Sequence, residues 1–142
     1  MHSTPQNILS SFVILLIAVS LLSFIQYANV HTDGVYQSKP HQTGNEHSPY
    51  VYHYLRFFPN GKVISIASPG KPEDIKKWFA DTNKYVSKGI YKINGNQINF
   101  QCISQQGKVN YRGEILVGSL ILHVHSYFNT NHSTDEFQFV HD

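Results

Sequence analysis

The chain has 142 residues, of which 13% are aromatic and only 14% charged, and its formal net charge at pH 7 is +2. This length holds one small domain behind a targeting segment, and the apolar content is too high for a disordered protein. The lysines are scattered from Lys39 to Lys108 without a run and no nucleic-acid-binding motif occurs, so we expect no nucleic-acid partner.

The first element in the chain is an apolar segment without charge, from Ile8 to Ile25. Its 18 residues exceed the core of about 7–15 residues in a signal peptide and fall within the roughly 17–25 residues of a transmembrane helix. Gln26 stands where a cleavage site before Asn29 would need a small residue. We expect residues 1–28 to be a single-pass membrane anchor, with a cleaved signal peptide of a secreted or periplasmic protein as the alternative.

The next residues, 29–49, have the composition of a linker with one early strand at 34–38, followed by a loop. From residue 50 the chain shows strand patterns at regular spacing, and Asn60-Gly61 and Asn94-Gly95 favour tight hairpin turns. We therefore expect a β-domain over 50–142, with strands at 50–58, 62–68, 88–93, 97–104, 109–117, 120–128 and 134–140.

One segment, 72–80, departs from the strand pattern. Ile75, Trp78 and Phe79 recur at helical spacing, and Pro72 suits the first position of a helix. The segment predicts a short helix whose apolar face packs on the sheet or plugs one end of a barrel.

About eight short strands joined by tight turns predict an all-β fold, either a barrel or a sandwich. Alternation along the strands predicts which side chains face inward. Cys102 is among them, and we expect it to be a small buried side chain rather than a reactive thiol. The predicted inward residues are Ile98, Phe100, Cys102, Leu120, Leu122, Val124, Phe128, Phe137 and Phe139.

The hairpin at residues 52–64 reads YHYLRFFPNGKVI. It resembles a YxYLRFFPDGxV hairpin in the C-terminal β-domain of one subfamily of F-box proteins. Residues 68–72, 88–93 and 135–137 are loosely similar to later parts of that domain, so the resemblance covers about 50–140.

The resemblance implies an antiparallel lipocalin-like (calycin) barrel of about eight strands and carries over no catalytic residue and no cofactor. The chain has no F-box, so the resemblance does not imply a ubiquitin-ligase adaptor. The Gly-x-Trp signature of true lipocalins is missing from the first strand, which reads Gly34-Val35-Tyr36.

Five side chains are candidates for binding a ligand: Tyr52, Tyr54, Arg56, Tyr91 and Tyr111. Tyrosines have apolar faces and polar tips, so they can line a pocket, but strands also favour them for ordinary packing. Arg56 lies in an apolar strand. It either meets an acidic ligand group or a partner such as Glu114, or it points outward and covers neighbouring aromatic rings with its stem.

His123 and His125 are the best candidates for metal ligands, because residues two apart on a strand point to the same side. His53 is a candidate third ligand on another strand. The alternative is a polar pair on the outer face, and we expect no metal or other cofactor, since two ligands do not make a zinc site. No catalytic motif such as HExxH, GxGxxG, CxxC or Gly-x-Ser-x-Gly occurs, so we expect no enzyme.

Two functions remain open for such a domain. The first is a non-catalytic binding protein, at the membrane or secreted, whose barrel takes a small apolar or amphipathic ligand. The second is a protein-interaction module whose barrel is filled by Phe100, Leu122, Phe137 and the aromatic residues of the helix. A cavity above about 300 Å³ would favour the first function.

Overall fold

The computed structural model describes residues 29–42 and 44–142, and the expected anchor at residues 8–25 lies outside them. None of the helices in the described residues has the length and apolar character that a membrane crossing requires. The strands are β1 (Gly34–Ser38), β2 (His41–Gln42), β3 (Tyr50–Phe57), β4 (Lys62–Ser68), β5 (Ser87–Asn94), β6 (Gln97–Ser104), β7 (Gly107–Leu116), β8 (Ser119–Ser126) and β9 (His132–His141).

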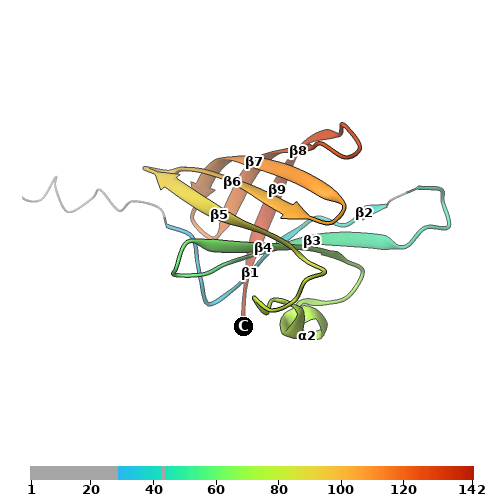
Figure 1. Cartoon of the computed structure of the whole chain (residues 1–142), viewed down its shortest axis with the longest axis horizontal. Coiled ribbons are helices and arrows are strands. Elements are labelled where there is room, and N and C mark those ends of the chain that lie inside the picture. The colour runs from blue at the N-terminus through green and yellow to red at the C-terminus, as the bar shows by residue number, and fades with distance from the viewer. Residues whose placement is uncertain (1–28, 43) are drawn as a thin grey trace, which may run out of the picture.

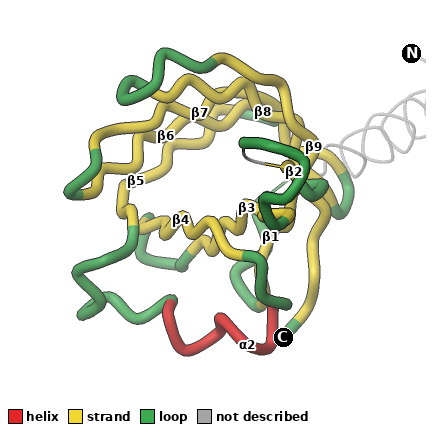
Figure 2. Tube along the Cα trace, turned by 90° about the vertical axis from the view of Figure 1, so that its right-hand side faces the viewer, coloured by secondary structure: helices red, strands yellow, loops and turns green. Residues whose placement is uncertain are grey.

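The strands form a closed antiparallel barrel. Their order is β1-β9-β8-β7-β6-β5-β4-β3-β2, and an additional pairing of β1 with β3 closes the ring over eight strands, leaving β2 as a short extension on β3 (Figures 1 and 2). The predicted all-β barrel is therefore confirmed. The strand at 34–38, expected in a linker ahead of the domain, pairs Tyr36 with both Leu55 and Phe139 and so completes the barrel.

Strand boundaries agree with the sequence-based ones to within two residues, with one difference in the expected linker and one in the expected β-domain. β2 forms where a loop was expected. β8 ends at Ser126, so alternation does not extend to Phe128, which lies in the following turn with 64% of its surface exposed rather than facing inward. The hairpin turns are as predicted, with positive φ at Gly61 and Gly95.

Large inward side chains fill one half of the barrel, which we call the closed end. Tyr36, Phe57 and Phe137 are fully buried there, and Val30, just before β1, packs against the same cluster. The predicted inward residues Ile98, Phe100, Leu120 and Leu122 belong to this core. Cys102 is also buried in it, and burial raises the pKa of its thiol to about 12, which keeps it protonated at neutral pH.

A second, smaller core lies outside the barrel wall. The predicted helix is shorter than expected, with α2 at Pro72–Ile75 followed by a 3-10 turn, η1, at Lys76–Trp78. Ile75 and Phe79 pack on Tyr54 and other outward side chains of β3 and β4, so the segment covers the barrel wall and does not plug its end (Figure 2). Trp78, expected in the apolar face, is 42% exposed, because the 3-10 turn rotates it away.

Two glycines allow neighbouring strands to approach closely inside the barrel. A Cβ atom at Gly113 would lie 1.9 Å from the Ile121 carbonyl oxygen, and one at Gly89 would lie 2.0 Å from that of Gln101. Glycine at these positions lets β5 and β7 bend sharply enough to close a small ring of strands.

Candidate functional site

The half of the barrel opposite the closed end is hollow. A cavity of about 750 Å³ opens there between the β4–β5 connection, the β6–β7 turn and the β8–β9 connection. Figure 2 looks into this end, which we call the mouth. The cavity exceeds the roughly 300 Å³ at which small-molecule sites begin. Its inner wall is formed by His53, Ser65, Ala67, Val109, Tyr111, Val124, Ser126 and Ser133.

The size of the inward side chains explains why this half is hollow. Inward positions near the closed end carry tyrosine, phenylalanine and leucine. Toward the mouth the same strands carry Ser65 and Ala67 on β4, Ser126 on β8 and Ser133 on β9. An eight-stranded barrel leaves an interior that large side chains just fill, so small ones leave a cavity.

Hydroxyl groups are placed along the cavity wall. The Tyr111 and Ser65 hydroxyls are 3.1 Å apart and hydrogen-bonded, and burial raises the pKa of Tyr111 well above its usual range, so its phenol stays neutral. The Ser126 Oγ atom is buried and has no hydrogen-bond partner among the described residues. A buried hydroxyl without a partner is costly, and a bound molecule or water could supply the missing bond.

His53 adds an imidazole to the polar wall of the cavity near β2. His53 faces inward from β3, and burial lowers its pKa, with a further lowering by His41 that Asp135 opposes. The rings of His41 and His53 are 5.6 Å apart, and His41 Nε2 is 3.7 Å from Asp135 Oδ1. The Ser133 hydroxyl donates a 2.7 Å hydrogen bond to Asp135. At neutral pH the wall therefore offers the uncharged imidazole of His53.

The five predicted binding residues do not form one site. Tyr111 lines the cavity. Tyr91 also faces inward but packs edge-on against Phe57 near the closed end, where its hydroxyl donates a 2.8 Å bond to the Phe58 carbonyl. It lies apart from the cavity wall.

The other three predicted residues, Tyr52, Tyr54 and Arg56, lie on the outward face of β3. The Tyr54 hydroxyl donates a 2.6 Å bond to the Gly70 carbonyl beneath the helix. Arg56 binds Asp142 rather than Glu114 or a ligand, so it is not a cavity residue. The sequence signal that could have predicted the cavity is the set of small residues at inward strand positions, Ser65, Ala67 and Ser126.

The predicted histidine pair lies together, as expected, on the outer face of β8. His123 Nδ1 is 2.8 Å from Thr134 Oγ1, and the His125 ring stacks on His132 at 3.9 Å. His53, the suggested third ligand, faces the barrel interior, so the wall of the barrel separates it from this pair. Among residues 29–42 and 44–142, no three potential metal ligands converge on one point.

Fold and cavity together define a closed antiparallel β-barrel, filled at one end and hollow at the other. Compared with protein-family models, with curated proteins and with solved structures, the chain has no match. The resemblance to the F-box β-domain stays a prediction.

Proposed function

We propose that this protein is a non-catalytic binding protein whose barrel holds a small amphipathic molecule. The observation that carries the proposal is the cavity of about 750 Å³ in the mouth half of the barrel. Its volume suits a small organic ligand, and its wall combines apolar side chains with a few placed polar groups, as ligand pockets do. The same cavity counts against the alternative of a filled barrel that acts only as a protein-interaction module.

The cavity wall favours a ligand with an uncharged polar group. Val109 and Val124 supply apolar contacts, and Ser126 supplies a hydroxyl without a partner in the described structure. His53 is neutral at physiological pH because burial lowers its pKa. A ligand hydroxyl or amide can bond these groups without the cost of burying a charge. We no longer expect an acidic head group bound by Arg56, which lies outside the barrel.

The position of the mouth bears on the expected membrane anchor. The described chain starts beside the closed end, where the His31 backbone N–H donates a 2.9 Å bond to the Tyr36 hydroxyl (Figure 1). If residues 8–25 anchor the protein, the barrel is held by its closed end and the mouth opens away from the attachment. We therefore propose a lipocalin-like barrel that takes its ligand from solution, whether it is anchored or secreted.

Native mass spectrometry of residues 29–142, purified without detergent, tests this function. These residues contain the closed barrel and both core clusters, so we expect them to fold by themselves. A small molecule that co-purifies and dissociates on unfolding is the expected result. Val109→Phe, which fills the cavity, should abolish its binding, whereas Val117→Phe on the fully exposed β7–β8 turn should not. An apo mass that stays unchanged after incubation with long-chain alcohols and amides would overturn the proposal.

A further inference from the structure

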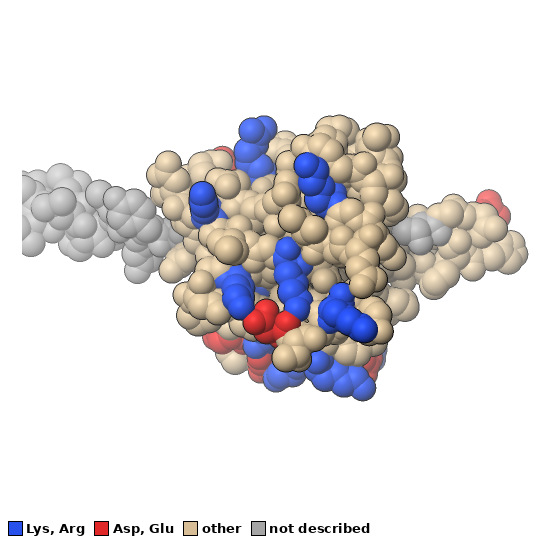
Figure 3. Space-filling model, viewed as in Figure 1, with Lys and Arg blue, Asp and Glu red and all other residues tan. Residues whose placement is uncertain are grey.

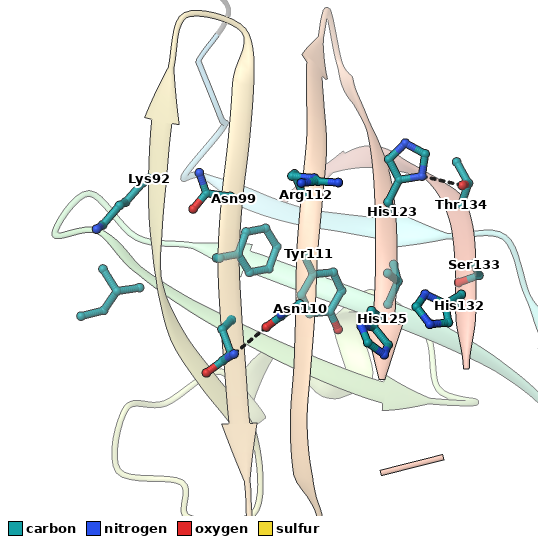
Figure 4. Close-up of a pocket in the computed structure, with 14 residues that line it drawn as sticks. Lys92, Asn99, Asn110, Tyr111, Arg112, His123, His125, His132, Ser133 and Thr134 are labelled. Atoms are coloured by element: carbon teal, nitrogen blue, oxygen red, sulfur yellow. Dashed lines mark hydrogen bonds between the residues drawn. The ribbon is translucent and has the colours of Figure 1, made fainter. Parts of the chain in front are cut away.

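The outer face of β5 to β9 carries a polar trough that is separate from the cavity. Its volume is about 830 Å³, and the residues lining it come from all five strands. Strand register arranges the outward side chains in two rows that cross the strands (Figure 4). One row is Lys92, Asn99, Arg112, His123 and Thr134, and the other is Ile90, Gln101, Asn110, His125 and His132. The strand backbone between the rows forms the floor.

The charged side chains that line the trough are all positive. Lys92 and Arg112 line it, and no aspartate or glutamate does. Neither cation has a carboxylate within ion-pair distance in the described part of the chain, although four other lysine and arginine side chains of the protein are ion-paired or bonded to Asp81 or Asp142. Figure 3 shows the side of the barrel that includes β5 and β6, where basic side chains are spread over the surface with fewer acidic ones. Unpaired cations along a groove attract an anionic ligand.

The rows that flank the trough on its two sides carry opposite charges. Lys88 and Lys108 stand on the mouth side of the trough, level with Ile103, while Glu114 and Glu136 stand on the side of the closed end. Lys108 lies over the Tyr127 ring at 4.5 Å. An anionic chain in the trough would therefore lie between a basic row and an acidic row.

The dimensions fit a linear ligand rather than a single ion. The trough crosses four inter-strand spacings of about 4.8 Å, so it is roughly 19 Å long, and Lys92 and Arg112 are about 10 Å apart. A chain with a negative group every 10 Å or so could meet both cations.

The lining residues also indicate which kind of linear polymer the trough binds. The amide of Asn99 and the carbonyl oxygen of the Gln101 side chain offer hydrogen bonds suited to hydroxyl groups, while Gln101 donates a 2.6 Å bond to Asn110, which donates a 3.1 Å bond to Tyr127. The His125 and His132 rings stack into a flat surface. A peptide finds no free strand edge along β6, β7 and β8, because these three strands are paired on both sides. A single-stranded nucleic acid finds no exposed tyrosine, phenylalanine or tryptophan among the lining residues on which its bases could stack.

We propose that this trough binds an acidic polysaccharide, whose carboxylate or sulfate groups meet Lys92 and Arg112 and whose hydroxyl groups meet the amide side chains. The chemistry shared by sulfated and uronic-acid chains is the repeating anion on a hydroxyl-rich backbone. This binding is independent of the ligand in the cavity, because the barrel wall lies between the two.

The test uses the full chain in phosphatidylcholine nanodiscs and titrates it with short heparin and hyaluronan chains, neutral dextran, poly-glutamate and an oligonucleotide. We expect one of the acidic sugars to bind, to weaken as salt rises, and to exceed all the other probes in affinity. The side-chain amide NMR signals of Asn99, Gln101 and Asn110 should shift on binding, and those of Asn60 and Gln138 should not.

Variants locate the binding. Lys92→Gln with Arg112→Gln should lower the affinity roughly tenfold, since each exposed charge contact contributes up to about fivefold. Lys39→Gln with Lys77→Gln, which removes two exposed cations elsewhere, should change it less than twofold. Equal losses in the two double variants would overturn the proposal. So would dextran binding as tightly, tighter binding of poly-glutamate or the oligonucleotide, or no binding of either acidic sugar.

Discussion

Arg56 and Asp142 join β3 to the residue that follows β9 through two parallel hydrogen bonds, Nη1 to Oδ1 at 3.0 Å and Nη2 to Oδ2 at 2.8 Å. Lys76 adds a third contact, at 3.6 Å from Oδ2. Bidentate pairs of this kind fix geometry as well as adding energy. The pair ties down the end of the strand that closes the barrel with β1.

We expect Asp142→Asn to lower the free energy of unfolding by about 1 kcal/mol, as for a well-formed exposed pair. The Arg56 hydrogen bonds hold the pKa of Asp142 below its usual range. The stabilisation is therefore present above the unfolded pKa of about 3.9 and is lost as pH falls through the lower folded value. Urea titrations should show a larger difference between wild type and variant at pH 7 than at pH 3. Glu46→Gln, in an exposed loop, is the control.

Removal of the hydroxyl group should destabilise the protein at one serine of the cavity wall, Ser65, but not at the other, Ser126. Ser65→Ala leaves the buried Tyr111 hydroxyl without its partner and should lower the free energy of unfolding by about 1 kcal/mol. Ser126→Ala removes a hydroxyl that has no partner in the described structure and should leave stability unchanged or raise it by up to about 1 kcal/mol. Ligand-free protein in urea measures both. Equal destabilisation would contradict the unpartnered state of Ser126.

Tyr54→Phe should lower the free energy of unfolding by about 1 kcal/mol, because the Gly70 carbonyl loses its donor. Burial raises the pKa of Tyr54 to about 12. The stabilisation is fully present below the unfolded pKa of about 10 and is lost as pH rises through the folded value. The gap between wild type and variant should therefore close between pH 10 and 12 in thermal melts. Tyr52→Phe should change the stability little, because the Tyr52 hydroxyl makes no hydrogen bond to the described residues.

Gly113→Ala should destabilise the barrel by about 3 kcal/mol, because the added Cβ meets the backbone of β8, which cannot move without opening the ring. Gly70→Ala is the matched change. Its Cβ would lie 3.3 Å from the Ser68 hydroxyl, a side chain that can rotate away. Chemical denaturation of the two variants should separate them clearly. A small effect at Gly113 would mean that β7 and β8 are less tightly bent than the structure has them.

Acid should weaken the mouth of the barrel through His53. Burial lowers the pKa of its imidazole, and of the neighbouring charged groups His41 lowers it further while Asp135 raises it. The stabilisation is complete above the unfolded pKa of about 6.5 and is lost as pH falls through the folded value. The melting temperature of wild type should therefore drop more between pH 7.5 and 5 than that of His53→Gln. His47→Gln, in an exposed loop, should behave like wild type.

Much of the architecture follows from local patterns. Alternation placed Phe100, Cys102 and Leu122 inside the barrel, and glycine turns such as Asn94-Gly95 set the hairpins, because both signals act between neighbouring residues. The same locality explains the errors. Phe128 obeys the alternation of β8 in sequence, but the strand ends two residues earlier.

Only the tertiary structure decides which half of the barrel is filled and which side chains face one another across the interior. Three features join residues that are far apart in sequence: ring closure by β1, the hydrogen bond between Tyr111 and Ser65, and the ion pair of Arg56 with Asp142. The cavity and the outer trough arise in the same way, from side chains of several strands at the same level of the barrel. Strand register sets such levels, and register depends on closing the ring as a whole, which no single segment of sequence encodes.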